Sequence, residues 1–245
     1  VAVALDPLDG SSNIDTNVSI GTIFSIIRVP SAADGGVDRA FMQPGTAQTA
    51  AGYVIYGAHV AMVLTVGAGT HFFTLDQDDR VFIQTGKPAA IAPATGEYAI
   101  NASNHRHWSD AMRAYIDDCV AGKDGPPGFD FNMRWIASLV AECHRILVRG
   151  GIFLYPRDDR KGYENGRLRL VYEANPIAML VEQAGGRAID GRTRIMDIVP
   201  TDLHQRAPLI FGSRQEIERI ERYNADPNAS FGQSPLFGRR GLLKT

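Results

Sequence analysis

Residues 6–15 combine two closely spaced carboxylates with a glycine and two hydroxyl side chains. They read Asp-Pro-Leu-Asp-Gly-Ser-Ser-Asn-Ile-Asp and follow the apolar run 1–5, which predicts a strand. Mg²⁺ prefers oxygen ligands and is often held by one or two carboxylates together with phosphate oxygens. Because Pro7 favours a turn between them, Asp6 and Asp9 can offer two carboxylates to one cation.

The neighbouring residues suit the same chemistry. The Leu8 carbonyl offers a third oxygen ligand, and Gly10 lets the backbone approach a ligand closely. Ser11 and Ser12 predict the start of a short helix, whose free N–H groups would face an anion. The same residues are good turn formers, so the motif taken alone fits a plain strand-to-loop corner about as well.

Composition limits the classes of protein that fit. The chain has 245 residues, 44% of them hydrophobic, which is enough for one large domain or two small ones. A net charge of −2 argues against a nucleic-acid partner held by bulk charge, and no apolar run reaches the length of a membrane span. Only Cys119 and Cys143 occur, and no signal peptide is visible, so we expect a cytoplasmic protein without a disulfide framework.

Hydrophobic patterning predicts strands and helices in alternation. Predicted strands lie near residues 17–29, 60–66, 70–76, 81–85, 97–101, 152–155, 167–172 and 209–212. Predicted helices lie near residues 110–122, with Ser109 as N-cap, and near 133–148, 175–184 and 214–223. A connector at 87–96 separates a domain at 1–90 from one at 91–225, with a loop at 31–36 and an irregular tail at 226–245.

Two further features have simple structural interpretations. Five residues share one face of the predicted helix 133–148: Met133, Ile136, Val140, Cys143 and Leu147. Cys143 is therefore interpreted as a core residue rather than a nucleophile. His105 and His107 would share one side of a strand and could bind a transition metal, but no further Cys or His lies nearby, so we interpret them as surface histidines.

Several segments of the chain resemble class I fructose-1,6-bisphosphatase. They are residues 1–28, which include Val-Ser-Ile-Gly-Thr-Ile-Phe-Ser-Ile-Ile-Arg, and residues 150–156, 167–173 and 204–208. The likeness runs in order to about residue 222. Asp-Pro-x-Asp-Gly alone is typical of the wider superfamily of lithium-sensitive, metal-dependent phosphatases, and the later segments favour its sugar bisphosphatase branch. The resemblance implies an α/β fold with mixed β-sheets sandwiched between α-helices.

The resemblance implies a metal site that Glu173 completes. Together with Asp6, the Leu8 carbonyl and Asp9, Glu173 would hold Mg²⁺ or Mn²⁺, with two or more ions per site. Glu173 lies between a predicted strand and a predicted helix, where a carboxylate is also favoured by the helix dipole alone. The sequence at 172–176, Tyr-Glu-Ala-Asn-Pro, is similar to that of the fructose bisphosphatases rather than the Trp-Asp of inositol monophosphatase relatives.

The resemblance also implies a set of substrate ligands: Asp9, Gly10, Ser11, Ser12, Asn101, Arg134, Tyr155, Arg167 and Arg169. Arg167 and Arg169 share one face of their predicted strand, and guanidinium groups suit phosphate oxygens, although exposed arginines on a strand often have no ligand. Asn101, Tyr155, Arg167 and an Arg134 from a neighbouring subunit would hold the 6-phosphate, which requires at least a dimer. The family is tetrameric, so a homotetramer is expected.

The sequence departs from the family pattern at three positions around the substrate. A lysine is common where Arg167 stands, and many members have tyrosines where Asn104 and Trp135 stand. The indole N–H of Trp135 can donate one hydrogen bond, but the pocket for the distal phosphate must differ from that of the family. Arg28 matches a residue of the family's AMP-inhibition site, most of which lies upstream of residue 1.

We therefore expect Mg²⁺-dependent hydrolysis of the 1-phosphate of fructose 1,6-bisphosphate by an activated water, in gluconeogenesis or the Calvin cycle. The resembled family has further acidic residues before the position of Val1, so we expect this numbering to begin inside a longer protein. Three alternatives stay open: a dual sedoheptulose-1,7-bisphosphatase, another inositol or nucleotide phosphatase of the superfamily, and an inactive truncated form that only binds sugar phosphates or subunits.

Overall fold

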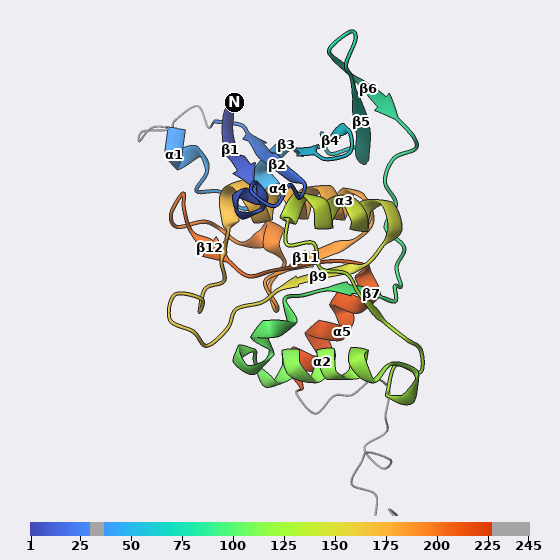
Figure 1. Cartoon of the computed structure of the whole chain (residues 1–245). Helices are drawn as coiled ribbons and strands as arrows, with labels where there is room; N and C mark the ends of the chain where they lie inside the picture. Colours follow the sequence, from blue (N-terminus) through green and yellow to red (C-terminus); the bar gives the residue numbers. More distant parts are fainter. Residues whose placement is uncertain (30–36, 227–245) are drawn as a thin grey trace, which may run out of the picture.

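Two β-sheets and two pairs of helices alternate as layers in the computed structural model, which describes residues 1–29 and 37–226 (Figure 1). Helices α3 (Leu139–Arg149) and α4 (Asn175–Gln183) lie between the two sheets. Helices α2 (Asp110–Ala121) and α5 (Arg214–Ala225) cover the outer face of the second sheet. This arrangement confirms the expected α/β class.

The first sheet is wholly antiparallel and follows the order of its strands in the chain. Its strands are β1 (Ala2–Asp9), β2 (Ile20–Ile27), β3 (Gln48–Tyr56), β4 (Val60–Thr65), β5 (Thr70–Asp76) and β6 (Val81–Thr85). Strand β3 was not expected from the sequence. It lies at the centre of the sheet and is buried on both faces, so its side chains do not alternate in the way that patterning detects.

The second sheet is mixed and has the order β11-β13-β9-β7-β8. Its strands are β7 (Glu97–Ala99), β8 (Asn132–Met133), β9 (Ile152–Tyr155), β11 (Arg187–Ile189) and β13 (Leu209–Gly212). Strand β7 runs parallel to β8 and β9, and the other pairs are antiparallel. Phe153 of β9 packs among α3 and α4, whereas Ile152 and Leu154 pack among α2 and α5. The sheet therefore has a hydrophobic core on each face.

Smaller elements complete the fold. A two-stranded pair joins β10 (Leu168–Arg169) to β12 (Arg206–Ala207), and α1 (Val37–Ala40) is a single turn beside β1. The loop expected at 31–36 and nearly all of the tail expected at 226–245 lie outside the described residues. Among the residues that are described, no helix is long and apolar enough to cross a bilayer.

Helix α3 begins later than the sequence predicted. Ser138 is its N-cap and accepts a hydrogen bond from the amide of Ala141. The helix predicted for 133–148 is wrong over its first residues, because Met133 lies in β8 and Ala137 has a left-handed backbone conformation, with φ of 62°. Helix α2 begins as predicted, with Ser109 accepting from Met112 N–H. Cys143 is fully buried in the core, as expected.

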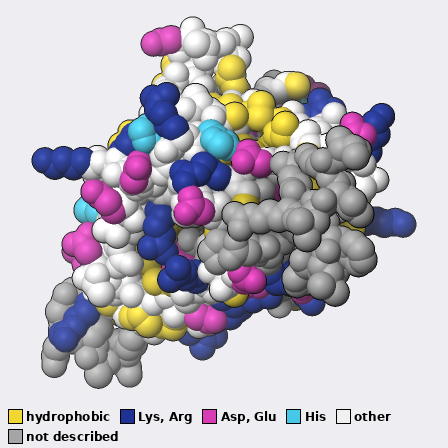
Figure 2. All heavy atoms as spheres, turned by 90° about the horizontal axis from the view of Figure 1, so that it is seen from below, with side chains coloured by type: hydrophobic (Ala, Val, Ile, Leu, Met, Phe, Trp, Pro, Cys, Tyr) yellow, Lys and Arg dark blue, Asp and Glu magenta, His cyan; other side chains and the backbone are white. Residues whose placement is uncertain are grey.

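The surface beside α2 carries both signs of charge. Figure 2 shows basic and acidic side chains interspersed on this face, outside the grey atoms. Arg113 of α2 pairs with Asp110, and Arg187 of the neighbouring sheet pairs with Glu221 of α5 at 2.8 Å. On the described part of this face, charges of opposite sign therefore neutralise one another at short range.

Candidate metal and phosphate site

A β-bulge brings the two aspartates of the opening motif together. The pairing partner of Asp6 on β2 is Ile23, and the partner of Asp9 is Gly21, so β1 has one extra residue between them. In a regular strand, residues three apart point to opposite faces. The bulge changes that phase, and carboxylates that the bare spacing would separate can point to one side. Thr22 holds the bulge by donating its hydroxyl to the Pro7 carbonyl at 2.9 Å.

Asp9 is also tied to the start of helix α3. Its Oδ2 accepts a hydrogen bond from the amide of Val140 at 3.0 Å. Nearby, the Asn13 side chain donates to the Ala137 carbonyl at 2.8 Å. A Cβ at Gly21 would lie 2.3 Å from the Val54 carbonyl oxygen, so β2 packs here at a distance that excludes any side chain. These contacts fix Asp9 between the first sheet and the helix layer.

Glu173 reaches the aspartates from a different part of the chain. The strand predicted for 167–172 is wrong beyond Arg169, because a π-helical turn (Leu170–Ala174) follows and runs directly into α4. This turn folds the Glu173 carboxylate back, and its Oε2 accepts from the Arg169 amide at 2.6 Å. Single π-helical turns are rare and often lie at functional sites.

Asp6, Asp9 and Glu173 together form a carboxylate cluster. One oxygen from each lies within 4.8 Å of the others. Burial is the main reason that the pKa of Asp9 is raised to about 6, against the lowering effect of the Val140 amide. Burial likewise raises the pKa of Glu173 to about 7, with the charges of Asp6 and Asp9 adding to the shift.

The carboxylate cluster fits a hard divalent cation. Three partly desolvated carboxylates repel one another when they are ionised. A bound cation offsets this unfavourable electrostatic energy. The donor set is oxygen only, which suits Mg²⁺ or Mn²⁺ rather than a metal bound by thiolates or imidazoles. The Leu8 carbonyl lies inside the bulge between the two aspartates. The carboxylate cluster is the only group of three or more potential metal-ligating acids, histidines or cysteines found among the described residues.

The backbone beside the carboxylate cluster has the turn expected for a phosphate. Gly10 adopts a left-handed conformation, with φ of 76°, and a 3₁₀ turn (Ser11–Asn13) follows, as predicted. The Asn13 amide closes the turn by donating to the Gly10 carbonyl at 2.8 Å. Ser11 and Ser12 are exposed at its start, where backbone donors are free of intrahelical partners.

Three of the expected ligands for a distal phosphate line one small hollow, which we call the distal hollow. Asn101, Tyr155 and Arg167 contribute to it, together with Arg160 and Tyr163 of the loop 157–166. The sequence predicted neither a strand nor a helix between 155 and 167. An arginine and a tyrosine three residues apart, in a segment with glycines at 162 and 166, were the available signal, but sequence alone does not show where a loop folds.

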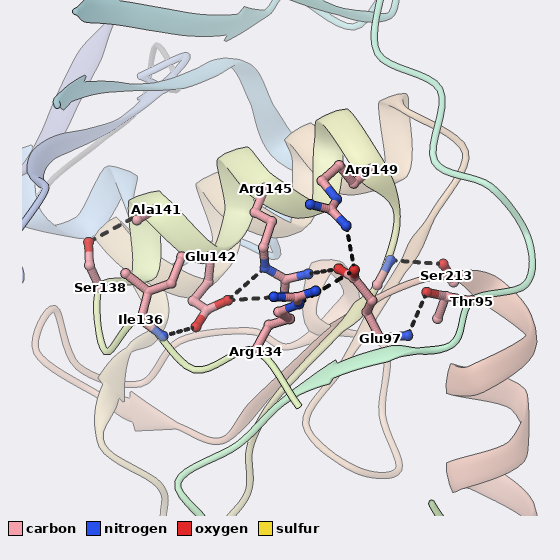
Figure 3. Close-up of polar contacts among 11 residues, drawn as sticks. Thr95, Glu97, Arg134, Ile136, Ser138, Ala141, Glu142, Arg145, Arg149 and Ser213 are labelled. Carbon is pink, nitrogen blue, oxygen red and sulfur yellow. Dashed lines mark hydrogen bonds and ion pairs between the residues drawn. The ribbon is translucent and has the colours of Figure 1, made fainter. Parts of the chain in front are cut away.

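Arg134 does not line the distal hollow of its own chain. Its Nε lies 3.6 Å from Oε1 of Glu97 (Figure 3). The Glu97 carboxylate also binds Arg145 at 3.0 Å and Arg149 at 2.6 Å. The buried Glu142 extends this network to Arg145. One chain does not test whether Arg134 serves a neighbouring subunit, so that assignment stays a prediction.

The remaining candidates lie away from the carboxylate cluster. His105 and His107 belong to a 3₁₀ helix (Ala102–His107) rather than a strand, and each pairs with a different acid, Asp117 and Asp159 respectively. Both therefore have surface ion-pair partners, as the surface interpretation implies. Arg28 follows β2 and is exposed, and its role at an AMP site stays a prediction.

Comparisons with known proteins place this geometry in a family. The family model described as "Fructose-1-6-bisphosphatase, N-terminal domain" matches residues 1–87, and the model of the C-terminal domain of the same family matches residues 91–225. The class 1 fructose-1,6-bisphosphatase of Rhizobium meliloti (strain 1021) is 58% identical over 244 residues, which are 100% of this chain and 70% of the relative. One such protein of Nitrobacter hamburgensis is 58% identical over 245 residues, with the same coverage.

A solved structure agrees with these matches. The holo form of Leishmania major fructose-1,6-bisphosphatase superposes with a TM-score of 0.85 at 40% identity, covering 91% of this chain and 68% of that one. Both the sequence and the fold are therefore similar over nearly the whole chain. The chain belongs to the class 1 fructose-1,6-bisphosphatase family, which consists of metal-dependent phosphoric monoester hydrolases of carbohydrate metabolism.

Proposed function

We propose that this chain binds Mg²⁺ through Asp6, the Leu8 carbonyl, Asp9 and Glu173, and hydrolyses the 1-phosphate of fructose 1,6-bisphosphate. The products are fructose 6-phosphate and inorganic phosphate. The observation that supports this most strongly is the carboxylate cluster, in which oxygens from two distant segments lie within 4.8 Å of one another. A bound divalent cation would polarise the phosphate and lower the pKa of a coordinated water.

The residues around the carboxylate cluster have separate tasks. The amides of Gly10 and Ser11 would donate to phosphoryl oxygens, where negative charge must be stabilised in the transition state. Ser12 would contribute a hydroxyl at the same turn. The Arg169 amide donates to Glu173, and the charge of Arg169 acts against the rise that burial causes in the pKa of Glu173. We therefore assign the Arg169 guanidinium to the same phosphate.

The other phosphate of the substrate would bind at the mouth of the distal hollow. Asn101, Tyr155 and Arg167 line it, and we assign them to the 6-phosphate. Arg167 lies two residues before Arg169, so one short segment would supply a cation to each of the two phosphates. Two cationic positions of this kind suit a substrate with two phosphates better than one with a single phosphate.

The proposal also covers the organisation of the protein. A boundary near residue 90 would separate a regulatory and metal-binding part from a sugar-phosphate-binding part, since the first sheet ends at Thr85 and the second begins at Glu97. We assign Arg134 to the distal phosphate of a neighbouring subunit in a homotetramer. Its position outside its own distal hollow is what such sharing requires.

Asp9→Asn tests the proposed function. The amide keeps an acceptor for Val140 but loses the charge, so phosphate release with Mg²⁺ and fructose 1,6-bisphosphate should fall by at least about 100-fold. Asp15→Asn is the matched control, because Asp15 is exposed two residues beyond Asn13 and outside the carboxylate cluster. Near-normal turnover by Asp9→Asn would reject the metal assignment.

A substrate panel separates the alternatives. Fructose 1,6-bisphosphate, sedoheptulose 1,7-bisphosphate, an inositol monophosphate and a nucleoside 3′-phosphate should be compared by kcat/KM for phosphate release. We expect the fructose bisphosphate to be preferred over the two monophosphates. A protein that binds fructose 6-phosphate but releases no phosphate from any substrate with Mg²⁺ or Mn²⁺ would favour the non-enzymatic alternative.

A further inference from the structure

The loop 157–166 contains an arginine that is held by a buried acid. Arg160 donates through Nε to both carboxylate oxygens of Asp158, at 3.1 and 3.2 Å, and Nη2 donates to Oδ2. The Asp158 side chain is only 5% exposed, whereas that of Arg160 is 32% exposed. A buried carboxylate bound in this two-pronged way fixes the orientation of its guanidinium group. Arg160 is therefore a positioned cation rather than a freely moving surface side chain.

A tyrosine ring links this cation to a second one. The guanidinium carbon of Arg160 lies 4.3 Å from the centre of the Tyr163 ring, and that of Arg167 lies 4.6 Å from it. Each contact is within the range of a cation–π interaction. Asp158 pairs with Arg160 alone, and Arg167 has no carboxylate partner among the ion pairs of the described residues. Two cations thus share one ring, and only one of them is neutralised.

The loop is anchored where Asn101 and Tyr155 lie. The Tyr163 amide donates to the Arg160 carbonyl at 2.9 Å, and the Asp159 amide donates to the His107 carbonyl at 3.1 Å. The 3₁₀ helix that contains His107 is capped by the Asn101 side chain. The loop and the other wall of the distal hollow are consequently parts of one hydrogen-bonded unit.

The polar groups of this unit are suited to an anion. Asp158 uses Nε and Nη2 of Arg160, and Nη1 makes no hydrogen bond to any described residue. The distal hollow itself is narrow, with space for about one water molecule. An anion larger than water would therefore bind at its mouth, where it would also offset the repulsion between the two guanidinium groups.

We propose that Arg160 and Tyr163 are specificity-determining residues of the distal phosphate subsite, with Arg160 binding the phosphate beside Arg167 and Tyr163 positioning both guanidinium groups. This inference rests on the proposed function, because it takes the distal hollow to be where the phosphate remote from the carboxylate cluster binds. It adds to Arg167 a second cation of the same chain and an aromatic support, and only the folded loop places them there.

The test measures binding of fructose 6-phosphate by calorimetry and hydrolysis of two substrates. Arg160→Gln should weaken fructose 6-phosphate binding and raise KM for fructose 1,6-bisphosphate by about 10- to 30-fold, the scale of one charge-assisted hydrogen bond. Hydrolysis of fructose 1-phosphate, which has no distal phosphate, should be unchanged. Arg157→Gln is the matched control, because Arg157 lies on the same loop but lines a different groove.

Substitutions of Tyr163 test its positioning role. Tyr163→Phe retains the ring and should bind fructose 6-phosphate within about twofold of the unmodified protein, whereas Tyr163→Ala should weaken binding by about 3- to 10-fold at constant kcat. If Arg160→Gln fails to fold because Asp158 loses its partner, Arg160→Lys keeps the charge without the two-pronged geometry. It should still weaken binding several-fold.

The possible outcomes distinguish this inference from the proposed function. If Arg160→Gln and Tyr163→Ala bind fructose 6-phosphate as tightly as Arg157→Gln does, the inference is wrong while the proposed function stands. If the unmodified protein does not bind fructose 6-phosphate, the inference is overturned together with the placement of the distal phosphate. A loss of fructose 1-phosphate hydrolysis equal to that of fructose 1,6-bisphosphate would show a general structural effect and would also overturn it.

Discussion

Removing one charge from the carboxylate cluster should stabilise the metal-free protein while it destroys the metal site. The pKa of Glu173 is raised from 4.5 to about 7, mainly by burial and then by the charges of Asp6 and Asp9. A raised pKa means that the folded state binds this proton more tightly than the unfolded state does. Protonated Glu173 therefore contributes its full stability to the folded state below about pH 4.5, and this contribution is lost as the pH rises through about 7.

The size of the effect follows from that shift. About 2.5 pKa units at 1.36 kcal/mol each give a cost of about 3 kcal/mol for ionised Glu173 at pH 8. Glu173→Gln has no such cost and keeps an acceptor for the Arg169 amide. For a chain of this size, 3 kcal/mol corresponds to a rise in melting temperature of about 6 to 12 °C.

The assay is thermal unfolding of the purified protein at pH 5 and pH 8, with a chelator and with excess Mg²⁺. Without metal, Glu173→Gln should melt higher than the unmodified protein at pH 8, with a much smaller difference at pH 5. Mg²⁺ should raise the melting temperature of the unmodified protein and not that of the variant. Glu218→Gln, at an exposed position of α5, is the control and should match the unmodified protein throughout. Equal melting of Glu173→Gln and Glu218→Gln at pH 8 without metal would refute the reasoning.

Two further predictions concern the phosphate turn and the subunit contact. Gly10→Ala should lower the free energy of unfolding by about 1–2 kcal/mol and weaken competitive inhibition by inorganic phosphate. The reason is backbone strain, because φ of 76° is unfavourable for any residue with a side chain, although a Cβ would meet nothing closer than 3.4 Å. An unchanged denaturant midpoint would contradict this. Arg134→Gln should raise KM for fructose 1,6-bisphosphate by about tenfold with little loss of stability, because the Arg134 side chain is half exposed and lies 3.6 Å from a Glu97 that keeps two other arginine partners. Mixed oligomers with Asp9→Asn subunits should recover the normal KM, and a failure to recover it would exclude a shared site.

Much of the fold could be predicted from local patterns. The Ser109 cap, the apolar run of β9 and the alternation of β2 and β4 all gave elements close to those observed. These features depend on residues a few positions apart, which is the range over which capping and alternation act. Two predictions failed for reasons that are also local. Strand β3 was missed because it is buried on both faces, and the helix predicted from residue 133 begins only after Ala137, which has a left-handed backbone conformation.

The candidate site could be predicted only in part from such local patterns. By itself, the sequence determined which residue types were available: two aspartates around a proline, then a glycine turn, and an isolated glutamate before a helix. Only the tertiary structure decided that they converge. The bulge opposite Gly21 sets the phase of Asp6 and Asp9, and the π-helical turn folds Glu173 toward them. The same holds for Arg160 and Tyr163, because the position of a loop depends on packing and hydrogen bonds between segments distant in sequence, which no local spacing encodes.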